Sequence, residues 1–220
     1  MMDFEAIGRY LPLFWRSMLL TLKIGWLGIL LAVVIGIVSA LVIYYRIPFF
    51  KIVFKVYIEL FRNTPLLIQL FFLYFALPKI GIVVSAEACG VLGIGLLGGS
   101  YMSESFRSGL EAVDQSQRES ALSLGMTDRQ VMLHVIFPQA AAHSAPSFVA
   151  NVIFLLKETS VFSAVSLMDL MFTAKDLIGL YYKTAECLTM LVVFYLIILL
   201  PVSIGGSLLE RRLRHASFGT

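Results

Sequence analysis

The sequence has few charged residues, and this excludes an ordinary soluble domain. Only 14% of its residues are charged, whereas 59% are hydrophobic. An average soluble domain carries roughly 25% charged residues. A soluble chain of 220 residues could not bury so much apolar surface. Lipid is therefore the natural solvent for this chain, and we expect an all-α integral membrane protein.

Side chains that build metal, redox or nucleotide sites are also scarce. Cys89 and Cys187 lie in apolar runs without clustered His or Cys partners, so we expect no metal site and only small core roles for them. The phosphate-binding pattern G-x-x-x-x-G-K-[ST] is absent, so we expect no cofactor in this chain. A net charge of only +3 gives no reason to expect a nucleic-acid partner. Asp3 and Glu5 replace the basic start of a cleavable signal peptide.

Long apolar runs are what the sequence has instead. A transmembrane helix needs about 20 mostly apolar residues, and such runs predict about five spans in a single membrane domain over residues 1–220. We place them at residues 24–45, 57–77, 88–110, 135–156 and 187–209. The third run is rich in glycine, with Gly95 and Gly99 at a spacing that permits close helix contact. Pro138 and Pro146 predict that the fourth helix starts late.

Basic residues predict how the chain is oriented in the membrane. Arg and Lys concentrate between spans one and two, between spans three and four, and after span five. Cytoplasmic segments carry this excess, so the N-terminus should lie outside and the C-terminus inside. Residues 165–184 then form an external connection, which could hold a short interfacial helix.

The connection at residues 111–138 has the most specific pattern. Ser116 with Glu119, and Thr127 with Gln130, have capping-box spacing. Gly125 stands where a helix needs a left-handed terminator. We expect a helix at residues 117–124 and a second at 128–137, stopped by Pro138. A helix this short is marginal alone in water. The spacing fits a docking element for another protein or an ordinary structured loop.

A family resemblance favours the docking element. Glu119-Ser120-Ala121, then Gly125, then Ile136-Phe137-Pro138 resembles the EAA loop of ABC importer permeases, with Ser120 in place of Ala. The resemblance implies that Glu119, Ser120, Ala121, Gly125 and Pro138 couple the permease to its ATPase.

Further segments resemble the subfamily that imports polar amino acids, and the resemblance runs from about residue 21 to 212. They are residues 57–67, with Asn63 where Gly is usual; 104–109, containing Glu104 and Arg107; 138–140; and 157–160, with Glu158 where Asp is commoner. The resemblance implies a type I (MetI-like) fold.

The resemblance also implies the partners. They are two cytoplasmic ATPase subunits holding ATP and Mg²⁺, a second copy or a related permease, and an extracytoplasmic amino-acid-binding protein, all at a bacterial cell membrane. This chain itself would then have no enzymatic activity.

Charges within the predicted spans are candidates for the substrate path. Ionisable groups at membrane depth are costly and usually face a cavity or a partner. Our candidates are Glu104, Arg107, Lys157, Glu158, Thr159 and Ser160. If the fourth helix starts near His143, Lys157 lies about 20 Å along it. The alternative is that acid–base pairs lock the bundle, which we favour for Glu59 with Arg62; for Glu104 with Arg107 both interpretations stay open.

Two other function classes were compared with the importer. An intramembrane enzyme would need a motif such as H-E-x-x-H or G-x-S-x-G, and neither occurs. A channel or scaffold would leave the capped loop without a purpose. Within the importer family the resemblance leaves acidic amino acids, glutamine, cystine, basic amino acids and opines open as substrates, and glutamine or glutamate is our first expectation. The sequence leaves open whether the permease pairs with itself or with a relative.

Overall fold

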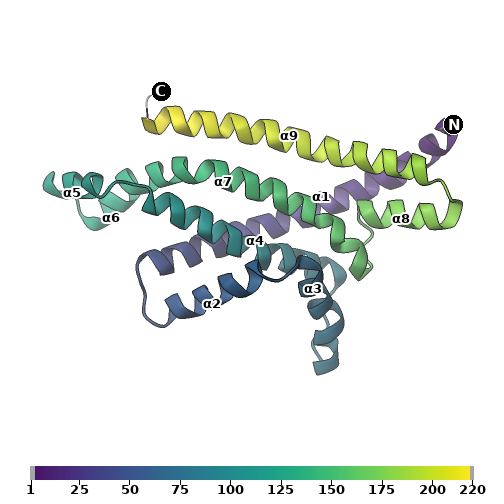
Figure 1. Ribbon diagram of the computed structural model, residues 1–220, viewed down its shortest axis with the longest axis horizontal. Helices are drawn as coiled ribbons and strands as arrows, with labels where there is room; N and C mark the ends of the chain where they lie inside the picture. The colour runs from purple at the N-terminus through teal and green to yellow at the C-terminus, as the bar shows by residue number, and fades with distance from the viewer. Residues whose placement is uncertain (1–2, 219–220) are drawn as a thin grey trace.

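The computed structural model describes residues 3–218 of the chain, in which every regular element is a helix. Figure 1 shows long helices running side by side, with both ends of the bundle carrying shorter ones. The elements are α1 Phe4–Tyr44, α2 Phe50–Arg62, α3 Leu66–Phe71, η1 Phe72–Ala76, η2 Leu77–Ile80, α4 Ala86–Glu111, α5 Gln115–Ser123, α6 Asp128–Val131, η3 Met132–Ile136, α7 Phe137–Glu158, η4 Thr159–Val165, α8 Leu170–Tyr181 and α9 Thr184–Phe218.

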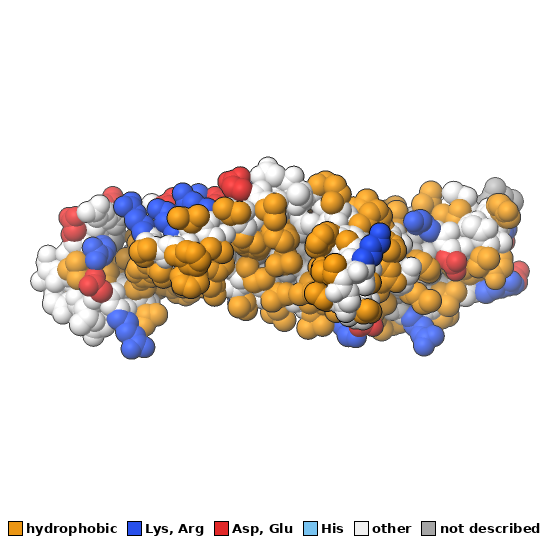
Figure 2. All heavy atoms as spheres, turned by 90° about the horizontal axis from the view of Figure 1, so that it is seen from below, with side chains coloured by type: hydrophobic (Ala, Val, Ile, Leu, Met, Phe, Trp, Pro, Cys, Tyr) orange, Lys and Arg blue, Asp and Glu red, His pale blue; other side chains and the backbone are white. Residues whose placement is uncertain are grey.

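The surface agrees with a membrane location. Among the described residues, three helices are long and apolar enough to cross a bilayer: Phe4–Tyr44, Asp128–Val165 and Thr184–Leu213. A bent pair, Phe50–Arg62 with Leu66–Ile80, makes a fourth candidate. α4 has the length of a fifth span, at 26 residues. In Figure 2 hydrophobic side chains cover most of the middle of the molecule.

α1 is about twice as long as the predicted first span. Its 41 residues begin at Phe4, where Asp3 accepts hydrogen bonds from the backbone N–H groups of Glu5 and Ala6. An Asp in this position satisfies N–H groups that a helix leaves unpaired. Hydropathy located the apolar part of the helix and missed the twenty residues before it, which contain charged side chains.

The predicted span at residues 57–77 is not one continuous helix, because the chain bends by 106° between α2 and α3. Pro65 adopts an extended conformation at the bend, and the residue before a proline disfavours helix. The buried Gln69 amide donates to the carbonyls of Phe61 (3.1 Å) and Thr64 (3.0 Å) that the break leaves without helical partners. In Figure 1 the segment after the bend projects from the bundle at a steep angle.

α4 is the central helix, and its glycines allow close contact with α1, as predicted. A Cβ added to Gly95 would collide with Leu31, and one added to Gly99 would collide with Ile35. On the α1 side, a Cβ on Gly36 would collide with Met102 of α4. Small residues at such contacts let two backbones approach. The glycine-rich run therefore serves helix packing.

Pro138 does not stop a helix, contrary to prediction. α6, η3, α7 and η4 form one continuous helical rod, Asp128–Val165, of 38 residues. A proline ring clashes with the carbonyl four residues earlier and offers no N–H. The π-helical turn Met132–Ile136 precedes Pro138, and there the Phe137 N–H bonds to Met132 O, five residues back. This wider turn accommodates the ring, so the fourth span starts earlier than expected.

The connection between the fourth and fifth spans holds the short helix that was predicted, α8. Its N-terminal carboxylate, Asp169, is fully buried and accepts hydrogen bonds from the N–H groups of Phe172 and Met171. Thr21 of α1 accepts a hydrogen bond from Leu170 N, and Ser17 hydrogen-bonds Thr173, so α8 is tied to α1. Burial raises the pKa of the Asp169 carboxyl to about 7, although the hydrogen bonds from these N–H groups act to lower it.

Asp169 should make the stability of the chain depend on pH. A carboxyl whose pKa is raised on folding stabilises the fold at low pH, and this contribution is lost as the pH rises through about 7. We expect the free energy of unfolding to fall by about 1 kcal/mol between pH 6 and pH 8. Asp169→Asn keeps the cap and should abolish that part of the pH dependence. Thermal unfolding of both proteins at the two pH values measures it; identical pH dependence would contradict the assignment.

Candidate functional site

The α5–α6 unit, residues 115–131, lies at one end of the bundle (Figure 1). α5 begins at Gln115, with Asp114 accepting a hydrogen bond from Ser116 N (2.8 Å). That bond lowers the pKa of Asp114. The predicted capping box of Ser116 with Glu119 is therefore wrong, because the chain enters the helix two residues earlier. Glu119 instead accepts from the Gln115 side chain (2.8 Å).

The turn between α5 and α6 follows the sequence prediction. Gly125 has a φ of +82°, in the left-handed region that favours glycine. Its N–H bonds to Leu122 O (2.9 Å), and Met126 N–H bonds to Ala121 O (3.2 Å). The second predicted capping box, Thr127 with Gln130, is present in both directions. Local chemistry thus fixes the path of the turn.

Tertiary contacts make the two short helices one unit and attach it to the bundle. Arg118 of α5 forms an ion pair with Asp128 of α6 at 2.7 Å. Ala121 is the buried residue of α5, and it packs in a small apolar cluster. The other buried members of this cluster are Leu110, Val131, Ile136 and Ala140. Glu119 and Ser120 remain exposed on the outer side, where a partner could reach them.

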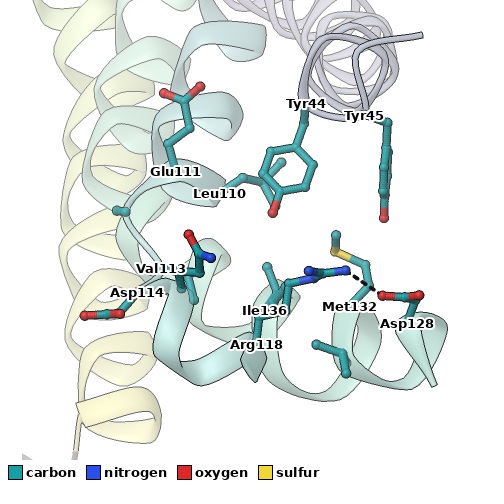
Figure 3. A pocket seen from close by; sticks show the side chains of 13 residues that line it. Tyr44, Tyr45, Leu110, Glu111, Val113, Asp114, Arg118, Asp128, Met132 and Ile136 are labelled. Carbon is teal, nitrogen blue, oxygen red and sulfur yellow. Dashed lines mark hydrogen bonds and ion pairs between the residues drawn. The ribbon is translucent and has the colours of Figure 1, made fainter. Parts of the chain in front are cut away.

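A hollow of about 970 Å³ separates this unit from the end of α1. Figure 3 shows Tyr44 and Tyr45 on one side of the hollow and the Arg118–Asp128 ion pair on the other. Leu110 and Ile136 line its inner wall. The unit is therefore held by the apolar cluster and stands off from α1.

The continuous rod joins the α5–α6 unit to the candidate charges on α7. Lys157 lies 20 residues beyond Phe137, so it is about 30 Å along α7 and not the predicted 20 Å, because the helix starts before His143. The residues at this end of α7 differ in solvent exposure. Lys157 is exposed, and Glu158 and Ser160 are partly buried. Thr159 is fully buried, donates to Leu156 O (2.7 Å) and packs close to Gly25 of α1.

Glu104 and Arg107 belong to a network that joins α4 to α2. Arg107 donates to Glu104 and to Glu111, each with a shortest distance of 2.7 Å. The predicted pair of Glu59 with Arg62 is wrong: Arg62 turns to Glu104 (3.8 Å) and lies over the Tyr101 ring. Glu59 accepts from the Asn63 amide (3.2 Å) instead. Glu104 thus lies between two arginines from different helices.

Removing the Glu104 charge should destabilise the bundle. Glu104→Gln leaves Arg62 and Arg107, both partly shielded, without their shared carboxylate. We expect a loss of about 1.5 kcal/mol, the lower end of the range for hydrogen bonds to charged groups, because Arg107 keeps its pair with Glu111. Glu87→Gln, which breaks an exposed pair with Lys23 (2.8 Å), should cost less than about 1 kcal/mol. Thermal unfolding in detergent compares them; equal effects would place Glu104 among the unimportant surface charges.

Comparison with known proteins decides what kind of protein this is. Residues 32–215 match the family described as binding-protein-dependent transport system inner membrane component. The chain belongs to this family. This inner membrane component is therefore the membrane-spanning permease subunit of an ABC importer.

The curated relatives of this inner membrane component carry names of amino-acid transporters. It is 34% identical to "Probable amino-acid ABC transporter permease protein y4tG" of Sinorhizobium fredii, over 88% of this chain and 84% of the relative. It is 34% identical to "Probable glutamine ABC transporter permease protein GlnP" of Bacillus subtilis, over 81% and 83%. "Arginine transport system permease protein ArtQ" of Bacillus subtilis is 29% identical, over 97% and 98%.

Solved structures have the same fold. A chain from "Crystal structure of an amino acid ABC transporter with histidines" matches with a TM-score of 0.88 and 34% identity, covering 96% of this chain and 99% of that one. A chain of the MetNI methionine ABC transporter in an inward-facing conformation matches with a TM-score of 0.78 at 16% identity, covering 93% and 98%. The second likeness confirms the MetI-like fold.

Sequence reasoning about this inner membrane component missed three parts of the site. The Asp114 cap could have been found, since Asp before a helical segment is a start signal. The Arg118–Asp128 ion pair joins residues ten positions apart, and no helical spacing indicates it. Tyr44 lines the hollow beside the α5–α6 unit together with residues far away in the sequence, and no local pattern indicates that contact.

Proposed function

We propose that this permease subunit forms the translocation path of an ATP-driven importer for polar amino acids, with glutamine or glutamate as its substrate. The names of relatives that cover more than four fifths of the chain support the amino-acid class. A glutamine permease is among those at 34% identity. The arginine permease is less similar, at 29%.

One structural observation carries the mechanism. The α5–α6 unit is stiffened by two caps, a glycine turn and an ion pair, and it continues without interruption into the rod that ends beyond Lys157 and Glu158. A push on α5 therefore moves the whole rod, because a helix transmits displacement along its axis. Glu119 and Ser120 would meet the ATPase, Ala121 would hold α5 against the apolar cluster, Gly125 would hold the turn, and Pro138 would lie where the rod enters the bundle.

This mechanism also defines the partners of the chain. Two cytoplasmic ABC ATPases would bind ATP and Mg²⁺ and receive α5 in a groove of each. A second copy of this permease, or a related one, would complete the path. An extracytoplasmic binding protein would deliver the amino acid. ATP-driven closure of the ATPases then turns the rods and opens the cavity outward, so ATP hydrolysis belongs to the partner and not to this chain.

We place the chain in a bacterial cell membrane with its N-terminus outside and its C-terminus in the cytoplasm. The α5–α6 unit, the α1–α2 connection and the end of α9 lie at the same end of the bundle in Figure 1. This end carries Arg46, Lys51, Arg118 and Arg211, and cytoplasmic segments are enriched in such residues.

We assign the substrate path to the end of α7. Lys157 and Glu158 form no ion pair within the described residues, so their charges stay available to the ammonium and carboxylate groups of an amino acid. Ser160 is partly accessible beside them, whereas Thr159 supports the segment from within. Glu104 and Arg107 were candidates as well; the pairing of Glu104 with both Arg107 and Arg62 favours a role in holding α2 and α4 together.

Reconstitution tests the proposed function. Vesicles containing this chain, its ATPase and candidate binding proteins should accumulate labelled glutamine or glutamate only when ATP is present on the ATPase side. A channel would pass substrate without ATP, and a scaffold would pass none. Copurification of the chain with a cytoplasmic ABC ATPase is the second requirement, and failure to copurify would contradict the proposal.

A further inference from the structure

α2 presents two adjacent rows of side chains that this chain does not cover. In Figure 1 the helix lies along the edge of the bundle. Residues four apart share one face of a helix. The apolar row consists of Ile52, Val56 and Leu60, which are 57–67% exposed. The polar row contains Lys55 and Glu59, which are exposed as well.

The two charges of the polar row have opposite signs but do not pair with each other. Lys55 and Glu59 are four residues apart, a spacing at which an ion pair can form, although Lys before Glu is the less favourable order. Neither residue forms an ion pair in the described part of the chain. Glu59 accepts a hydrogen bond from the Asn63 amide (3.2 Å). Both charges are therefore available to a group outside the chain.

Lipid is a poor cover for the polar row. α2 is the first half of the bent pair that is a candidate span, and in the orientation proposed above it enters the membrane from the cytoplasm. Glu59 lies about 14 Å along the helix from Phe50, whereas the whole hydrocarbon layer is about 30 Å thick. Ionised groups at such depth need a partner or water. Acyl chains can cover the apolar row, but the charges beside it require a polar partner.

A second copy of this chain supplies a partner for both charges. A two-fold axis along the membrane normal would bring the same face of α2 together from two copies, with both helices running in the same direction. In such a contact every pairing occurs twice, because each copy presents the same surface to the other. Lys55 of each copy would meet Glu59 of the other. A row that carries both signs is complementary to itself.

The relief of α2 also suits another helix. An open groove lies between the two rows and is lined by Lys55, Val56, Glu59, Leu60, Asn63 and Thr64. Side chains four residues apart form a ridge, and the groove beside it accepts the ridge of a neighbouring helix. An apolar seam with opposite charges at its side is the pattern that pairs helices in coiled coils. α2 therefore has both parts of a helix-pairing surface.

We propose that a second copy of this permease docks on α2. Lys55 of each copy pairs with Glu59 of the other, and the apolar rows of the two copies pack together beside these ion pairs. The inference rests on the proposed function in one respect, that the permease works as a pair. It adds that the two members are identical chains and that they meet in the cytoplasmic half of the membrane.

Exchanging the charges between copies tests the ion pairs. Two full-length versions with different affinity tags are produced in one membrane without the ATPase, which could itself hold two permeases together. Copurification of one tag with the other is then measured in mild detergent. Lys55→Glu or Glu59→Lys alone should weaken self-pairing at least about tenfold, because like charges then face each other twice. A Lys55→Glu copy and a Glu59→Lys copy should pair with each other as the wild type does.

This exchange separates a contact between chains from a role within one chain. Only groups on different copies can restore pairing when two defective variants are mixed. Lys23→Glu is the control, because it reverses an exposed lysine of α1 (58%) and should leave copurification unchanged. No recovery in the mixed pair would overturn the proposal. So would a failure of wild-type copies to copurify, in which case ATP-driven uptake with a related permease would still support the proposed function.

Disulfide formation tests the apolar row. Oxidation of membranes should link two copies of Val56→Cys into a dimer. Val34→Cys of α1 is the matched control, since Val34 is exposed to nearly the same extent (60% against 62%). The native Cys89 and Cys187 are buried, so the wild type should stay unlinked. Equal linking of Val34→Cys and Val56→Cys, or linking of Val34→Cys alone, would contradict docking on α2.

Discussion

Gly125→Val should abolish amino-acid uptake while leaving the permease inserted in the membrane. The backbone at Gly125 has a φ of +82°, which costs an ordinary L-residue about 1–2 kcal/mol and a β-branched residue more. Val would leave that conformation and release the hydrogen bonds that end α5 at Leu122 and Ala121. The α5–α6 unit would then no longer be a stiff extension of α7. We expect uptake to fall by at least about tenfold.

The chain contains a matched control for this strain. Gly81 has nearly the same backbone, with a φ of +86°, and a Cβ at either glycine meets nothing within 4 Å. Gly81→Val therefore introduces similar strain far from the α5–α6 unit and should retain most uptake. Gly125→Asn, which tolerates the left-handed region, should recover part of the activity. Membrane quantity, ATPase copurification and uptake are measured together. Normal uptake by Gly125→Val would remove the coupling role of this turn.

Glu158→Gln should impair transport without weakening ATPase binding. The change removes a partly buried charge that forms no ion pair within residues 3–213, and it keeps the size of the side chain. If Glu158 faces the substrate ammonium, the loss of one charge-assisted hydrogen bond should weaken substrate recognition by about 1.5–3 kcal/mol, or roughly tenfold to a hundredfold in apparent affinity. We expect a raised KM for uptake, or a changed preference among amino acids.

Two comparisons separate recognition from stability in that experiment. Glu158→Asp keeps the charge and should retain more of the substrate preference than Glu158→Gln. ATPase copurification should be unchanged in both variants, because α5 is more than 30 Å of helix away from residue 158. The unfolding temperature should be unchanged as well. Uptake kinetics equal to those of the wild type would mean that Glu158 has a structural role.

Local sequence was sufficient where neighbours along the chain decide the conformation. Gly125 and the Thr127–Gln130 capping box have the conformations expected from their spacing. In the same loop, the first cap was misplaced because Asp114 competes with Ser116 for the helix start. Either side chain could accept the hydrogen bond that caps the first turn of α5. The packing of Ala121 in its cluster selects the helix start that buries this residue.

Charged pairs show the limit of spacing rules. Glu104 and Arg107, three residues apart on a helix, do pair as their spacing allows. Glu59 and Arg62 have the same spacing and do not, because α4 brings Glu104 close to Arg62. A helical spacing says which side chains can meet, and the neighbouring helix decides which of them do.

Composition, apolar runs and local motifs determined by themselves that this chain is a helical membrane protein with a capped loop of the importer type, because hydropathy and hydrogen-bond capping depend on residues close in sequence. Only the tertiary structure decided the continuation of the rod through Pro138, the burial of Thr159 and the pairing of Arg62 with Glu104. These features depend on which helix faces which at a distance in sequence, where packing outweighs local preference.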